Sequence, residues 1–193
     1  MKIVIDPGHG APDSGAIGPR GTLEADINLS VAIALSKELC RRGHVASLTR
    51  SGLRRIFADN RGADLSARPA FANRIGADCF VSLHCNGAAN VAASGFEIYT
   101  TIGQDRSDAL ATEIFRAWSN VFRAQRKRTD YTDGDPDKEA NLKVLRECRV
   151  PSVLIEMAFI SNPAEEQWLL SPTNHHRMAF VIADGIVRWG KSV

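Results

Sequence analysis

Short apolar runs alternate along this chain with helix-length amphipathic segments, and this alternation most restricts the folds that it can adopt. The runs bounded by turn-forming residues predict strands, at residues 3–5, 45–49, 79–84, 95–100 and 152–156, with a further short one at 143–145. Apolar residues at helical spacing predict helices, at residues 24–42, 67–75, 105–124, a short one from Pro163 and a final one over 173–189. This order predicts an α/β fold: an open, mostly parallel sheet with helices on both faces.

The whole chain, residues 1–193, is expected to form a single domain. It contains no internal repeat, linker or low-complexity tract, and its length allows a core that needs no disulfide support. Pro69 is expected to be tolerated only in the first turn of its helix. The polar segment 125–140 contains Asp133-Gly134-Asp135-Pro136 and is predicted to be a mobile loop.

Composition excludes several classes of partner. A net charge of +2 is too small to indicate nucleic-acid binding, and no apolar stretch is long enough for membrane insertion. The four cysteines show no CxxC pair, so buried free thiols are expected rather than disulfides. The amino terminus has no basic region followed by a long apolar one, which predicts synthesis in the cytoplasm without a signal peptide of its own.

Four polar residues lie where an apolar run meets a loop or helix. His9, His84 and Glu156 each stand at or just after the end of a predicted strand, and Glu24 opens a predicted helix. In open α/β sheets, ligands gather at the carboxyl ends of the strands. We therefore expect these scattered residues to form one site.

Two imidazoles and a carboxylate are a ligand set that suits one Zn²⁺ ion. His9, Glu24 and His84 would be the metal ligands, and Glu156 would be the catalytic residue that moves a proton between water and a leaving amine. Three polar residues close to these in sequence could support them as neighbours of the ligands, namely Asp6, Asp13 and Asn86.

Each residue also has a structural explanation. A lone histidine at a strand end is more often a hydrogen-bonding residue than a ligand, and Glu24 could simply favour the positive end of a helix dipole. Glu156 is harder to explain in this way, because a carboxylate after Val-Leu-Ile on a buried strand is costly without a purpose. Taken together, the four residues favour a metal site.

The same segments resemble the zinc-dependent N-acetylmuramoyl-L-alanine amidases, a family of bacterial and phage cell-wall hydrolases. The resemblance covers nearly the whole chain, and its motifs are IVIDPGHGAPDSGAIGPRGTLEADINLSVA from Ile3, Leu48-Thr49-Arg50, SARPAFANRIGADCFVSLHCNG, Gly95-Phe96-Glu97 and LKVLRECRVPSVLIEMAFISNPAEEQWL. It implies a twisted sheet of about six strands. It also implies that His9, Glu24 and His84 bind zinc and that Glu156 is the catalytic glutamate.

The resemblance implies that the substrate is peptidoglycan and that the bond cleaved joins the lactyl group of N-acetylmuramic acid to L-alanine of the stem peptide. We expect a monomeric autolytic or endolysin-like enzyme that reaches the wall after release or export by another route. Two alternatives stay open: a zinc peptidase that cuts within the stem peptide, and a non-catalytic wall-binding module.

Overall fold

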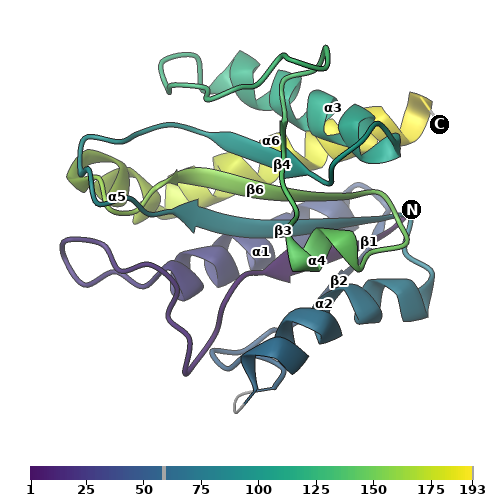
Figure 1. The fold of residues 1–193 in the computed structure, drawn as a ribbon, viewed down its shortest axis with the longest axis horizontal. Coiled ribbons are helices and arrows are strands. Elements are labelled where there is room, and N and C mark those ends of the chain that lie inside the picture. The colour runs from purple at the N-terminus through teal and green to yellow at the C-terminus, as the bar shows by residue number, and fades with distance from the viewer. Residues whose placement is uncertain (58–59, 193) are drawn as a thin grey trace.

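A computed structural model describes residues 1–57 and 60–192 of the chain. Within these residues six strands form one mixed sheet in the order β2-β1-β3-β6-β4-β5 (Figure 1). The strands are β1 (Lys2–Pro7), β2 (Val45–Leu48), β3 (Cys79–Asn86), β4 (Glu97–Thr100), β5 (Lys138–Glu139) and β6 (Ser152–Phe159). All neighbouring pairs are parallel except β4 and β6, which are antiparallel. The predicted α/β fold is confirmed.

Helices cover both faces of the sheet. They are α1 (Glu24–Arg41), α2 (Arg61–Ile75), α3 (Arg106–Val121), α4 (Lys143–Arg146), α5 (Pro163–Leu169) and α6 (Pro172–Ser192). One face carries α1, α3 and α6, which bury the larger apolar core, and the other carries α2 and α4 over a smaller one. None of the helices in the described part of the chain is long and apolar enough to cross a bilayer.

The three longest strands have apolar runs because both of their faces are covered. Ile3 and Ile5 of β1 lie in the larger core, whereas Val4 between them lies in the smaller one. Alternate residues of a strand point to opposite faces, so a strand covered on both sides must be apolar almost throughout. A polar residue on such a strand therefore requires a specific partner.

The prediction for residues 143–145 was wrong: this segment is the helical turn α4 and not a strand. Val144 and Leu145 are buried in the smaller core against α2. A short apolar run has no periodicity that separates the two conformations, so packing decided between them.

The start of α2 was also predicted wrongly. The helix begins at Arg61, six residues before Ala67, and the Asn60 side chain accepts a hydrogen bond from the Ala63 amide at 2.9 Å. Pro69 consequently lies inside the helix and not in its first turn. The sequence concealed this part of the helix because its buried position is taken by Asp64, which pairs with Arg68, and not by an apolar residue.

The predicted loop over 125–140 contains the edge strand β5 at its end. The cysteines are free, as expected, but the expectation that they are buried holds only in part. Cys79 and Cys85 are buried, whereas Cys148 is half-buried and Cys40 lies exposed on α1.

Candidate metal site

His9 is held in an unusual backbone conformation immediately after β1. Its φ of 61° lies in the left-handed region, which a residue other than glycine rarely adopts. The Gly8 amide donates to the Leu83 carbonyl at 3.0 Å, and Arg68 donates to the His9 carbonyl at 2.8 Å. These bonds fix the backbone of the turn from which the His9 imidazole reaches Glu24.

Glu24, the first residue of α1, forms the centre of the site. It is 4% exposed, and its Oε2 lies 3.2 Å from Nε2 of His9 while its Oε1 lies 3.0 Å from Nδ1 of His84. The amides of Ala16 and Cys85 donate to the same carboxylate at 2.8 and 3.0 Å. Burial opposes ionisation, but the hydrogen bonds and charges of the two histidines outweigh it and hold the pKa of Glu24 well below its usual range.

The nitrogen and oxygen atoms of His9, Glu24 and His84 lie within 4.8 Å of one another. Two imidazoles and one carboxylate in this arrangement could hold a metal ion, and they are a donor set that zinc prefers. The Glu24 carboxylate contacts both imidazoles, and this holds the His9 and His84 rings toward a common point. The structure thus brings together the three residues that the sequence singled out as ligands.

Glycines make room for this arrangement. A Cβ atom at Gly8 would lie 2.2 Å from Cε1 of His84, and one at Gly15 would lie 2.4 Å from Oε2 of Glu24. Neither position can therefore carry a side chain without displacing a candidate ligand, His84 or Glu24. Glycine suits both positions because it has no Cβ atom, so the backbone can lie close against the candidate ligands.

Glu156 lies beside the ligand set because of strand register. It pairs with His84 of β3 on one side and with Glu97 of β4 on the other. Paired residues on neighbouring strands share a face and are separated by about 5 Å, so the three side chains form a row. Burial and the negative charges of Glu24 and Glu97 raise the pKa of Glu156 well above its usual value.

The Oε2 atom of Glu156 is buried and has no hydrogen-bond partner among the described residues. A buried carboxyl oxygen that is left unsatisfied costs free energy unless a ligand, a proton or water completes it. This carboxyl group is therefore available for proton transfer next to the three converging donors.

Of the three neighbours proposed from sequence, Asp13 is the one whose side chain contacts a ligand. Its Oδ2 lies 3.1 Å from Nδ1 of His9. Burial opposes protonation of His9, but Glu24 and Asp13 outweigh burial and raise its pKa. A carboxylate on the second imidazole nitrogen is the usual way to orient a metal-binding histidine.

Asp6 and Asn86 lie further from the ligand atoms. Asp6 is fully buried and accepts hydrogen bonds from Ser82 at 2.7 Å and from Arg68 at 2.9 Å. It reaches the site indirectly, because Arg68 also donates to the His9 carbonyl. Asn86 donates to Glu97 at 3.2 Å and makes no side-chain hydrogen bond to His9, Glu24 or His84 among the described residues.

Sequence reasoning gave no role to Arg68 or Glu97. Arg68 joins Asp6 to Asp64 on α2 through ion pairs of 2.9 and 2.8 Å, all three residues being buried. Glu97 contacts Arg128 and Tyr99 and lies 3.3 Å from Lys138. Glu97 could have been recognised from its position on a predicted strand. A carboxylate that is buried on a strand needs a specific partner or role, as was argued for Glu156.

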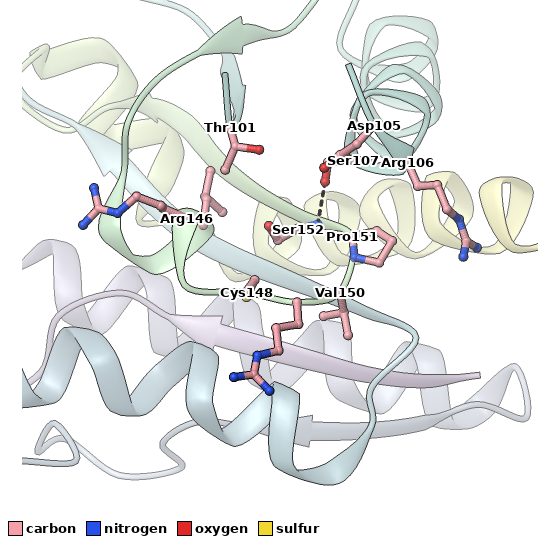
Figure 2. Close-up of a pocket in the computed structure, with 11 residues that line it drawn as sticks. Thr101, Asp105, Arg106, Ser107, Arg146, Cys148, Val150, Pro151 and Ser152 are labelled. Carbon is pink, nitrogen blue, oxygen red and sulfur yellow. Dashed lines mark hydrogen bonds between the residues drawn. The ribbon is translucent and has the colours of Figure 1, made fainter. Parts of the chain in front are cut away.

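A separate hollow of about 450 Å³ lies away from this site (Figure 2). Ser152 at the first position of β6 lines it, whereas Glu156 is four positions further along the strand, about 13 Å away. Cys148 also lines the hollow, and burial raises the pKa of its thiol to about 12. The hollow therefore offers no activated nucleophile at this position.

Comparison with known proteins assigns the fold and the family. The sequence profile of the N-acetylmuramoyl-L-alanine amidases matches residues 3–188. The chain is 29% identical to the amidase AmiA of Escherichia coli over 97% of this chain and 75% of that protein. Its structure is similar to that of the amidase AmiC2 of Nostoc punctiforme, with a TM-score of 0.84 and 30% identity over 99% of this chain and 97% of that one.

The CwlD amidase of Clostridioides difficile gives a TM-score of 0.89 at 25% identity and covers 100% of this chain and 99% of that one. The sequence match and these two structures agree over almost the full length, so the resemblance extends beyond the site to the strands and helices that position it. The chain belongs to the N-acetylmuramoyl-L-alanine amidase family.

Proposed function

We propose that this chain is a zinc-dependent hydrolase of peptidoglycan, which cleaves the amide between the lactyl group of N-acetylmuramic acid and L-alanine. Membership of the amidase family supports the reaction. The observation that carries the zinc mechanism is the convergence of His9, Glu24 and His84 beside the unpartnered carboxyl group of Glu156.

His9, Glu24 and His84 are the residues that would hold the ion. When bound, zinc supplies Lewis acidity, which polarises an amide carbonyl and makes water a better nucleophile. The roles of the protein groups follow from their positions. Asp13 keeps Nδ1 of His9 engaged, so that Nε2 is the nitrogen directed at the centre of the site.

Glu156 is the group that moves the proton. We assign it the role of accepting a proton from the attacking water and delivering it to the nitrogen of the departing L-alanine. Its raised pKa, caused by burial and by Glu24 and Glu97, suits the second step, because the carboxyl group retains a proton until a stronger base takes it. A departing amine is such a base.

Glu97 would position and tune Glu156. Burial opposes ionisation of Glu97, but Tyr99, Arg128 and Lys138 outweigh it and lower its pKa. A permanent negative charge directly across the β4–β6 pair then disfavours the ionised form of Glu156.

The test is digestion of purified peptidoglycan by the full chain, with and without added zinc, and identification of the products by mass spectrometry. The proposal requires new L-alanine amino termini together with glycan strands that keep their lactyl groups. Cuts within the stem peptide would instead support a zinc peptidase, and binding without release of either product would support a wall-binding module.

The matched variants are Glu156→Gln and Glu113→Gln. Loss of the proton carrier is expected to lower turnover by about 10²- to 10⁴-fold while zinc content and thermal stability are unchanged. Glu113 lies on α3 and forms an ion pair with the exposed Arg116, away from the candidate site, so its variant should keep full activity. Undiminished lysis after chelation, or full activity of Glu156→Gln, would contradict the mechanism. A role as an autolytic or endolysin-like enzyme at the wall stays a prediction.

A further inference from the structure

Aspartates gather at the start of α3 and in the loop before β5. Carboxylate oxygens of Asp108, Asp133 and Asp135 lie within 4.8 Å of one another. Asp137 adjoins them, and its Oδ2 accepts a hydrogen bond from Thr100 at 2.5 Å. Thr100 ends β4 three residues beyond Glu97, about 10 Å along the strand, so the cluster lies outside the candidate zinc site.

Buried oxygens in this cluster lack partners. Asp108 is 5% exposed and Asp137 is 2% exposed, yet Oδ1 of each is buried without a hydrogen bond among the described residues. Oδ1 of Asp135 is in the same state. The side chains of Asp135 and Asp137 contact each other and can satisfy these oxygens only by sharing a proton, whereas a bound cation would satisfy all three oxygens.

No basic side chain among residues 1–57 and 60–192 forms an ion pair with the cluster. Among the described residues, none of the ion pairs includes Asp108, Asp133, Asp135 or Asp137. The donors to the cluster are uncharged: besides the Thr100 hydroxyl, the Gln104 amide lies 2.9 Å from Asp133 and 3.1 Å from Asp135, and the Asp105 backbone amide donates to Asp108 at 2.6 Å. Burial and the neighbouring Asp135 raise the pKa of Asp137 to about 8, which is the electrostatic result expected of carboxylates crowded together without a counter-ion.

We propose that Asp108, Asp133, Asp135 and Asp137 bind a Ca²⁺ ion. All of the donors are oxygens, which calcium and magnesium prefer and zinc does not require. Asp133, Asp135 and Asp137 alternate along the chain, as do the first three ligands of known calcium loops, and Gly134 bends the loop with a φ of 108°. Calcium is favoured over magnesium because it accepts irregular geometry and a larger number of ligands.

Such an ion would tie the loop to α3 near the candidate zinc site. Lys138 follows the loop directly, and Arg128 precedes it; both contact Glu97, which lies opposite Glu156. Asp105, whose backbone amide donates a hydrogen bond to Asp108 of the cluster, lines the hollow of Figure 2.

The test measures calcium binding by the zinc-supplemented full chain, with calorimetry and thermal unfolding. Calcium should bind at one ion per chain and raise the Tm by about 5–10 °C at a hundredfold excess over its Kd. Magnesium at the same concentration should give a smaller shift. Asp108→Asn combined with Asp135→Asn should abolish the calcium response, and Asp130→Asn, an exposed change in the same loop, should preserve it.

The stability of the double variant also tests whether the carboxylates of the cluster repel one another, and this test does not depend on a loss of calcium binding. In calcium-free buffer the double variant should be more stable than the parent chain, because two crowded negative charges are removed, and this result would show that it folds. If the parent chain does not bind calcium at millimolar concentration, the proposal is overturned. A proton shared between Asp135 and Asp137 would then be what relieves the crowding of their carboxyl groups. A calcium response that survives in the double variant would place the ion elsewhere and would also overturn the proposal.

Discussion

The two glycines that border the ligands allow a direct test of the candidate zinc site. In Gly8→Ala the new methyl group would lie 2.2 Å from Cε1 of His84, whereas ordinary contact begins at 3.4 Å. The imidazole must therefore move by about 1.2 Å if the backbone is to stay in place. Ligand distances in metal sites tolerate shifts of only about 0.2 Å, so this displacement exceeds the tolerance several times over.

Gly15→Ala places its methyl group 2.4 Å from Oε2 of Glu24 and 2.7 Å from Cδ2 of His9. Gly15 has a φ of 68°, so alanine also introduces backbone strain of about 1–2 kcal/mol. Gly21 is the matched control, because its φ is 83° and a Cβ there meets nothing within 4 Å. Gly52 is the control for Gly8, because it too has open space around the added atom.

We expect Gly8→Ala and Gly15→Ala to lower zinc affinity by about 10- to 100-fold or more, a loss at least as large as that for removing an outer partner of a ligand. The controls should keep the affinity of the parent chain. Competition with a chromogenic chelator measures this property without an activity assay, and circular dichroism checks folding. Unchanged zinc affinity in both glycine variants would refute the ligand assignment.

Three further changes test the surrounding structure. Asp13→Asn should weaken zinc binding by about 10- to 100-fold in the same competition assay, because the amide oxygen orients the imidazole less strongly than a carboxylate does. Arg68→Met should cost about 3–5 kcal/mol in urea unfolding, because it leaves Asp6 charged and unpaired in the interior. Burial opposes ionisation of Asp6, but Arg68 and the hydroxyl groups that bond Asp6 outweigh burial and lower the pKa of this carboxyl group. The stability that ionised Asp6 contributes is therefore fully present above the unfolded pKa of about 3.9 and is lost as pH falls below that value. The parent chain should therefore lose stability in acid more steeply than Arg68→Met, and parallel pH profiles would contradict this reasoning. Gly185→Ala should destabilise by about 1–3 kcal/mol, since its methyl group would lie 2.5 Å from the Ile114 backbone, whereas Gly190→Ala should cost less because it meets only the flexible end of Met1.

The sequence by itself determined five of the six strands, most of the helices and the identity of the candidate ligands, whereas it missed β5 and placed a strand where α4 lies. A short, continuous apolar run indicates a strand buried on both faces of a parallel sheet. Polar residues at the end of such a run stand out because their burial carries a desolvation cost. His9, His84 and Glu156 were visible for this reason, and Glu24 was visible as an acidic residue at the start of a predicted helix, before any distance between them was known.

Tertiary structure decided what depends on pairing and packing. The row of His84, Glu156 and Glu97 exists because β3, β6 and β4 pair in one register, and the sequence shows neither the register nor the strand order. Residues 143–146 became helical because they pack on α2, although their short apolar run fitted a strand equally well.

The buried charges show the same limit. Nothing in the sequence indicated that Asp64 and Arg68 are buried, since a charged side chain reveals its burial only when its partner is known. The sequence therefore determined which groups are present at the ends of the strands. The fold decided which of them meet, because contacts between distant segments depend on register and burial, which local patterns do not record.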